Sequence, residues 1–334
     1  MVALWDTTGA EVVRRLAAER RSAGGVTSGL ALTLIVVTEE KRVAEAEAAA
    51  TIAAQEHPTR LLIVVRRNVL DQASRLDAEV VVGGRLGPCE AVVMRMHGRL
   101  ALHAESVALP LLAPDVPVVT WWHCDPPERI AYDPLGVVAD RRVTDASVTA
   151  DPVAALRRRA EDYAPGDTDL SWTRITGWRT LIASAFDTVA SPAVGVRIMA
   201  SPTDPGAVLL AGWLKARLGI QPEIVGGEDR TDRRDGHSLR EVAVRLSDDS
   251  EVAVIRHDGT AVLRRTGYPD RIMPLLDRPL GDELAEELRR LDPDQPYADA
   301  LGTAFGLAGL SQRPGRRTHI WHDPALAERP EVSA

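Results

Sequence analysis

Apolar positions in the first half of the chain fall into short β-rich runs that alternate with helical patterns. The runs predict strands at 30–37, 60–65, 78–82, 90–96 and 116–121, and the helical patterns cover 7–21, 39–56 and 100–112. A strand, a helix and a second strand in this order predict a parallel βαβ unit. Strands that are apolar on both sides indicate a sheet covered by helices. We therefore expect residues 1–150 to form a three-layer, mostly parallel α/β domain.

The second half changes its pattern. Asp151 followed by Pro152 predicts a capped helix start, after which we expect a loop at 164–170, helices at 171–186 and 204–218, and a strand at 194–200. Alternating apolar and polar residues at 238–246, 251–256 and 261–265, separated by turn residues, predict an antiparallel meander. Helices at 282–291 and 297–304 follow. We expect a smaller α/β domain at 151–311 and a mobile tail at 312–334.

The predicted strand at 116–121 runs into two adjacent tryptophans. Trp121 and Trp122 precede His123, Cys124 and Asp125, and two prolines follow. Neighbouring side chains on a strand point to opposite faces, so we expect one tryptophan in the core and the other at a surface. An exposed tryptophan on a rigid loop is typical of an anchor for a protein partner. It is also typical of the floor of a ligand pocket, and the pattern alone does not choose between the two.

Composition narrows the class of protein. The 334 residues suffice for two domains, and 45% apolar with 26% charged residues is typical of a globular protein. A net charge of −8 argues against a nucleic-acid binder. The start of the chain lacks a basic region followed by an apolar core, and no apolar run reaches membrane-spanning length. We expect a cytoplasmic protein with no membrane partner, in which Cys89 and Cys124 are reduced thiols.

Motifs for catalysis, metals and cofactors are missing from the sequence. It has neither GxxxxGK[ST] nor GxSxG, and no CxxC or Cys/His set for zinc. The glycine-rich stretch 83–87 follows an apolar run, but Pro88 and a β-rich run come next, which favours a hairpin turn over a phosphate loop. His123 and Cys124 are neighbours on an extended segment, so their side chains point apart. We expect no catalytic residue, no metal and no cofactor.

Tryptophan is the commonest aromatic residue, with seven Trp against four Tyr and two Phe. In the helix predicted at 171–186, Trp172 and Arg179 lie near one stripe, while Arg174 and Trp178 are four residues apart on a neighbouring face. One interpretation is a core face with an exposed arginine edge. The other is that Arg174, Trp178 and Arg179 form a docking or anion-binding patch, because Trp and Arg are enriched at interface hot spots.

Several stretches together carry a resemblance. They are Trp-Trp-His-Cys-Asp-Pro-Pro at 121–127, Asp-Leu-Ser-Trp-Thr-Arg at 169–174, Gly-Trp-Arg at 177–179, the run from 201 to 214, and Leu-Trp-Asp-Thr-Thr at 4–8. In this order they resemble the glucose-6-phosphate dehydrogenase assembly protein family, OpcA, of actinobacteria and cyanobacteria, over about residues 1–310. The resemblance implies a non-catalytic partner that binds the dehydrogenase and promotes its assembly or raises its activity, in support of the oxidative pentose phosphate pathway and its NADPH supply.

The chemistry of the side chains, rather than the resemblance, selects the candidate partner-binding residues. They are Trp121, Trp122, His123, Asp125, Trp172, Arg174, Trp178 and Arg179. An alternative function is an enzyme or sensor that binds a sugar phosphate or a nucleotide at the carboxyl ends of the N-terminal strands.

Overall fold

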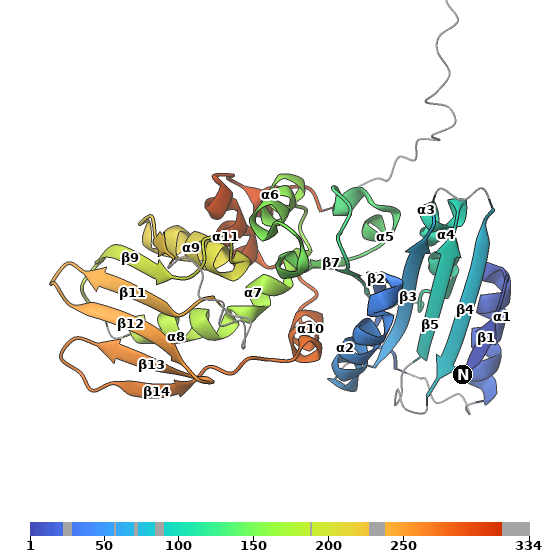
Figure 1. Cartoon of the computed structure of the whole chain (residues 1–334), viewed down its shortest axis with the longest axis horizontal. Helices are drawn as coiled ribbons and strands as arrows, with labels where there is room; N and C mark the ends of the chain where they lie inside the picture. The colour runs from blue at the N-terminus through green and yellow to red at the C-terminus, as the bar shows by residue number, and fades with distance from the viewer. Residues whose placement is uncertain are drawn as a thin grey trace, which may run out of the picture.

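The computed structural model describes residues 1–22, 29–56, 58–69, 73–83, 90–187, 189–226 and 238–315. Within them the chain forms two sheets that lie at opposite ends of an elongated molecule (Figure 1). Cys89, most of the glycine-rich stretch at 83–87 and all but the first residues of the predicted tail lie outside the described residues.

The first sheet has eight strands in the order β1-β4-β5-β3-β2-β6-β7-β8. Their bounds are β1 (Val2–Leu4), β2 (Leu32–Thr38), β3 (Thr59–Arg67), β4 (Arg75–Val82), β5 (Glu90–His97), β6 (Val118–His123), β7 (Arg141–Thr144) and β8 (Asp167–Asp169). All neighbours from β5 to β8 pair in parallel, and only β4 is antiparallel to its neighbours β1 and β5. The predicted mostly parallel sheet is confirmed, including the unit in which β2 and β3 are joined by a helix.

Helices cover both faces of this sheet. One face packs against α1 (Gly9–Ser22), α3 (Arg99–Leu102), α4 (Ala104–Ala108) and α5 (Pro134–Val137), and the other against α2 (Val43–Glu56) and α10 (Leu280–Leu288). The alanine-rich face of α2 lets α10 approach closely. A Cβ atom added at Gly281 of α10 would lie 2.5 Å from Cβ of Ile52 on α2. The two helices therefore form one tightly packed layer, although more than 200 residues separate them in sequence.

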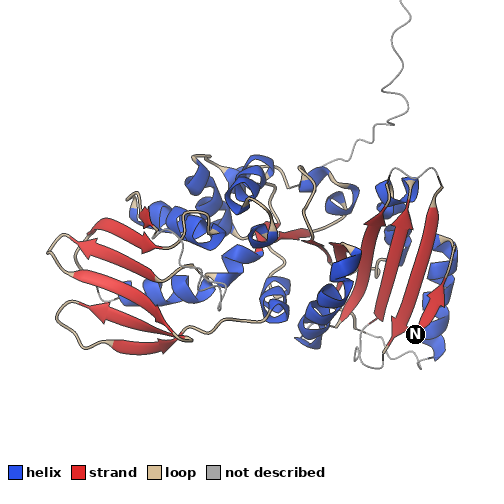
Figure 2. Ribbon diagram, in the orientation of Figure 1, coloured by secondary structure: helices blue, strands red, loops and turns tan. Residues whose placement is uncertain are grey.

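The second sheet has six strands in the order β10-β9-β11-β12-β13-β14. Its strands are among the red arrows at the left of Figure 2. Their bounds are β9 (Ala193–Met199), β10 (Glu223–Val225), β11 (Glu241–Leu246), β12 (Glu251–His257), β13 (Thr260–Arg265) and β14 (Arg271–Pro274). Only β9 and β10 pair in parallel, so the predicted meander is confirmed and extended by β14. Helices α8 (Thr176–Phe186) and α9 (Pro205–Leu218) pack on one face, and α11 (Gln295–Phe305) packs on α9.

Helix starts follow the capping residues of the sequence. The Asp151 carboxylate accepts a hydrogen bond from the Ala154 amide at the start of α6 (Pro152–Asp162), as the sequence predicts. Asp204 caps α9 in the same way through the amides of Gly206 and Ala207. Helix continuity is harder to predict. The helix expected at 171–186 breaks at Ile175 into α7 (Leu170–Arg174) and α8, and the one expected at 100–112 divides into α3, α4 and a 3-10 turn.

Elements from the second half complete the first sheet. The loop predicted at 164–170 is wrong in part, because β8 pairs with β7 there. Its Asp-Thr-Asp sequence has no β-strand signal, and the strand is instead held by polar contacts, including a buried ion pair between Arg142 and Asp167. Because β8 and α10 both follow residue 150, a domain division at that residue would separate the paired strands β7 and β8 of one sheet. The division at residue 150 stays a prediction.

Candidate functional site

The two tryptophans of β6 lie on opposite faces of the first sheet, and both side chains are 0% exposed. Trp122 packs in the core under α1 and α4, and Trp121 in the core under α2 and α10. The expectation that one of them stands at a surface is wrong. Strand β6 is central, and α10 covers the face that Trp121 occupies, so neither side of the strand is open to solvent.

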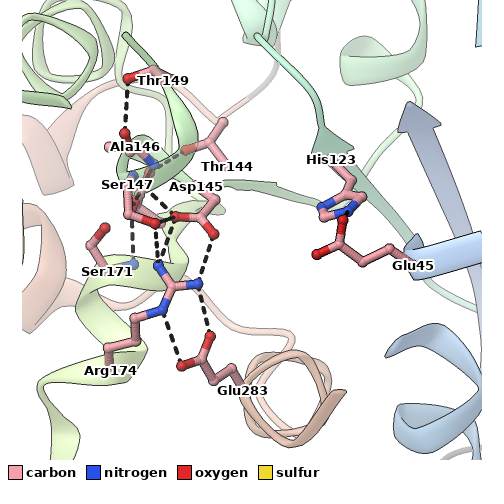
Figure 3. Close-up of polar contacts among 11 residues, drawn as sticks. Glu45, His123, Thr144, Asp145, Ala146, Ser147, Thr149, Ser171, Arg174 and Glu283 are labelled. Atoms are coloured by element: carbon pink, nitrogen blue, oxygen red, sulfur yellow. Dashed lines mark hydrogen bonds and ion pairs between the residues drawn. The ribbon is translucent and has the colours of Figure 1, made fainter. Parts of the chain in front are cut away.

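His123 lies at the carboxyl end of β6, beside the end of β2. Its Nε2 is 3.1 Å from Oε2 of Glu45 on α2 (Figure 3). Its ring lies against Trp121, with centroids 4.6 Å apart and the two rings tilted by 41°. Burial lowers the pKa of His123, and the nearby Glu45 carboxylate only partly offsets this. A buried, neutral imidazole that is oriented by Glu45 contributes packing at this end of the sheet.

Cys124 and Asp125 continue the chain beyond β6. The Cys124 thiol contacts the Val37 carbonyl oxygen at 3.5 Å, and burial raises its pKa to about 11. The thiol is therefore protonated at neutral pH and a poor nucleophile. The Asp125 side chain is exposed, unlike the three residues before the cysteine. The loop that follows is fixed to α6, because Arg159 donates to the carbonyl oxygens of Pro127 and Glu128.

Trp172 belongs to the core of the second half. Its indole Nε1 donates a hydrogen bond of 2.9 Å to Asp294 Oδ2, and the Arg179 guanidinium lies 3.5 Å above its ring. Burial lowers the pKa of Arg179 to about 10. Trp178 is equally buried, with Arg256 5.6 Å from its ring centre. The interpretation of these tryptophans as a core face is confirmed. Arg174 and Arg179 are half-buried, so they do not form the expected exposed edge.

Arg174 is held by two carboxylates from distant parts of the chain. Its Nη1 and Nη2 donate to the two oxygens of Asp145, each at 2.7 Å, and its Nε donates to Glu283 Oε1 at 3.0 Å (Figure 3). Burial alone would lower the pKa of Arg174, but the hydrogen bonds and charges of Asp145 and Glu283 raise it. Burial raises the pKa of Glu283 to about 7, against the opposing charge of Arg174. Arg174 is thus a structural cation rather than a free anion-binding group.

Further polar contacts continue from this triad along α10. Arg141 of β7 pairs with Glu287 at 2.6 Å, Thr176 Oγ1 donates to Glu286 Oε1 at 2.9 Å, and Arg278 donates to the Thr173 carbonyl oxygen at 2.8 Å. We name this set the seam network: Arg141, Asp145, Thr173, Arg174, Thr176, Arg278, Glu283, Glu286 and Glu287. It joins the first sheet to α7, α8 and α10. The sequence gives one signal for it, three glutamates at helical spacing on 280–288.

A hollow of about 410 Å³ opens next to the seam network. Arg174 and Trp178 line it together with Arg256 and the hydroxyl groups of Ser201 and Thr203, which precede α9. The break at Ile175 brings Arg174 and Trp178 to this one hollow. Trp121, Trp122 and the pair Trp172 and Trp178 instead lie in three separate cores, so the eight candidate residues do not form one surface.

The described residues contain no group of three or more His, Cys, Asp or Glu side chains placed to hold a metal ion. None of their helices is both long and apolar enough to cross a bilayer.

Two family models match the chain in sequence order. One is described as the glucose-6-phosphate dehydrogenase subunit N-terminal domain and matches residues 50–161. The other is described as the C-terminal domain of the same subunit and matches residues 165–301. The chain belongs to the OpcA family. The two matched segments meet beside α6 and β8, where the structure passes from the first sheet to the second.

Curated OpcA relatives come from cyanobacteria. Three are named putative OxPP cycle protein OpcA. The protein from Synechococcus elongatus is 30% identical over half of this chain and 38% of its own length. Those from Nostoc punctiforme and Synechocystis are 30% and 27% identical and are matched over 26% and 30% of their lengths. The chain thus aligns with less than half of the length of each relative. The expected similarity to actinobacterial members of the family stays a prediction.

Proposed function

We propose that this protein is a non-catalytic partner of glucose-6-phosphate dehydrogenase that promotes the assembly of the enzyme and raises its activity. The observation that carries the proposal is the match of both halves of the chain to OpcA models described as a subunit of that dehydrogenase. In this role the protein supports the oxidative pentose phosphate pathway in the cytoplasm. The high pKa of the Cys124 thiol is consistent with a role that does not use it as a nucleophile.

An activator needs higher affinity for the active form of its partner than for the inactive form. A rigid surface serves this purpose, because little conformational entropy is lost on binding. The seam network supplies rigidity between the two sheets, since Arg174 is fixed by a bidentate contact with Asp145 and a further hydrogen bond to Glu283. We therefore propose that the two halves approach the dehydrogenase as one rigid body.

The outer face of the six-stranded sheet is the surface that we propose for this contact. Cross-strand pairing aligns one outward row across all six strands: Val225, Met199, Glu241, Ile255, Val262 and Ile272. Val225, Met199 and Ile272 are 40%, 39% and 74% exposed. The adjacent row, which contains Ile198, Val242 and Val254, points the other way and is buried under α8 and α9.

This outward row is unusual for a sheet with one solvated face, where polar residues are the norm. Only Glu241 interrupts the apolar side chains, and it is paired with Arg197 at 3.0 Å. Contiguous exposed apolar side chains with a charged rim are typical of protein interaction surfaces. The buried tryptophans at 121, 122, 172 and 178 then contribute by supporting the fold, while Asp125 keeps an exposed side chain for direct contact.

Co-elution tests the proposal directly. The purified chain is mixed with the dehydrogenase of the same organism and separated by size exclusion, alongside each protein alone. We expect a new peak that contains both proteins at a fixed ratio. Separate elution at concentrations well above micromolar would contradict the proposed function, because assembly factors of this kind must form a complex to act.

A further inference from the structure

A second hollow, of about 250 Å³, lies on the side of the molecule formed by α6, α9, α11 and the start of β10. Its walls are mostly apolar and include Val208, Ile224 and Phe305. Small ligand sites in proteins share this character, with an apolar lining and a few polar groups that fix orientation. The polar groups here are two cations, Arg157 and Lys215, and the side chains of Gln221 and Thr303.

The charges of this hollow differ from those of the rest of the chain. Acidic residues outnumber basic ones by 48 to 40, yet no Asp or Glu lines it. Among the described residues, neither Arg157 nor Lys215 forms an ion pair, whereas Arg174 and Arg141 are held by carboxylates. Lys215 is one of only two lysines in the sequence. Two positive charges thus face one concave surface, and no carboxylate of the described part of the chain is paired with either.

Arg157 makes a cation–π contact at the edge of the hollow. Its guanidinium carbon lies 4.9 Å from the centre of the Phe305 ring, and this attraction favours a position of the cation at the hollow. The N–H donors of a guanidinium match the oxygens of a phosphate or carboxylate.

The base of the hollow is rigid. Gly212 of α9 lines it, and a Cβ atom at this position would lie 2.1 Å from the Ala300 carbonyl oxygen of α11. The backbones of α9 and α11 are therefore in direct contact beneath the hollow. This contact holds the distance between the walls, and the cavity exists before any ligand enters.

We propose that this hollow binds a small organic dianion that has an apolar part. The two cations neutralise the two charges of a phosphate monoester or a dicarboxylate, and the apolar walls contact its carbon skeleton. Its volume is too small for a dinucleotide, since sites for drug-sized ligands occupy about 300–1,000 Å³. The site lies on α6, α9 and α11 and is separate from the outer face of the sheet, so it does not depend on the proposed contact with the dehydrogenase.

Calorimetric titration of the full chain at physiological salt tests the inference. The probes are phenyl phosphate and phthalate, with benzyl alcohol as an uncharged control. We expect saturable one-to-one binding of at least one dianion and none of the alcohol. Binding of phenyl phosphate alone identifies a phosphate site, and binding of phthalate alone a carboxylate site. Absence of saturation by both dianions at millimolar concentration would overturn the proposal.

Substitutions locate the binding. Arg157→Gln and Lys215→Gln should each weaken the dianion about tenfold, the loss typical of one charge-assisted hydrogen bond. Arg158→Gln and Arg217→Gln remove the same charge from the same helices but lie outside the lining, and they should leave affinity unchanged. All four side chains are at least partly exposed, so the variants should fold. An equal loss in the control variants would show non-specific attraction and refute the site.

Discussion

The eight-stranded and six-stranded sheets differ in how their faces are used. Helices cover both faces of the first, with α10 supplied from residues 280–288, and its central strands are buried on both sides. Within the described residues, helices cover one face of the second sheet, and the outward row from Val225 to Ile272 is exposed or half-buried on the other. Large apolar residues therefore have different surroundings in the two sheets. In the first they are core, and in the second several of the outward ones stay exposed to solvent.

Removal of a tryptophan from the covered sheet is the largest expected effect. Trp122→Ala empties a site with 0% exposure and should lower the free energy of unfolding by about 3–5 kcal/mol. Urea denaturation measures the change. Trp5→Ala is the matched control, since Trp5 is 68% exposed and should change stability by no more than about 0.5 kcal/mol. A Trp122→Ala variant with a nearly unchanged free energy of unfolding would mean that this face of β6 is open to solvent.

Loss of Arg174 should break the link between the sheets. Arg174→Met leaves Asp145 and Glu283 buried without their cation and should cost about 3 kcal/mol. A double-mutant cycle with Glu283→Gln measures the coupling between the two residues. We expect the double variant to be more stable than the sum of the single losses predicts. Strict additivity would count against the triad as the element that joins the two halves.

The pH dependence of stability also tests the contacts between Arg174 and Glu283. Because burial raises the pKa of Glu283 to about 7 in the folded protein, above its ordinary value of 4.5, the folded state binds the proton more tightly. Protonation of Glu283 therefore contributes its full stabilisation to the folded state below about pH 4.5. This contribution to the free energy of unfolding, about 1–3 kcal/mol, is lost as the pH rises through 7. In Glu283→Gln this fall in stability should be reduced between pH 4.5 and 7. Equal slopes for both proteins would place the titration elsewhere.

A charge on the open sheet should affect binding but not folding. Ile272→Asp puts a carboxylate into the exposed row and should weaken affinity for the dehydrogenase by about 1–3 kcal/mol. Its stability should change by less than about 0.5 kcal/mol. Leu102→Asp, at an exposed leucine on α3 of the first sheet's helical layer, serves as the control and should bind like the original protein. If Ile272→Asp also binds normally, the contact lies on a different surface.

Local patterns in the sequence were sufficient for much of the fold. The unit of β2, α2 and β3, the meander, and the helix starting after Asp151 all follow from periodicity and capping. Strands β7 and β8 were missed because arginines and aspartates replace the usual β-branched run. Arg141 and Arg142 are buried there because Glu287 and Asp167, far away in sequence, neutralise them. No local sequence pattern predicts an ion-pair partner that lies so far along the chain.

The candidate residues were harder to place for the same reason. Alternation along β6 correctly sent Trp121 and Trp122 to opposite faces, but exposure depends on α10, which begins more than 150 residues later. The partners of Arg174 are equally distant. The outward row on the second sheet was also invisible, because it is set by the register of six strands and not by any one of them.

We propose that this protein acts by contact with glucose-6-phosphate dehydrogenase. The rate of NADP reduction by a fixed amount of the dehydrogenase, measured as the purified chain is added, tests this proposal. We predict a saturable rise in rate, with no NADP reduction by the chain alone. An unchanged rate across the titration, or turnover of glucose 6-phosphate by the chain itself, would contradict it.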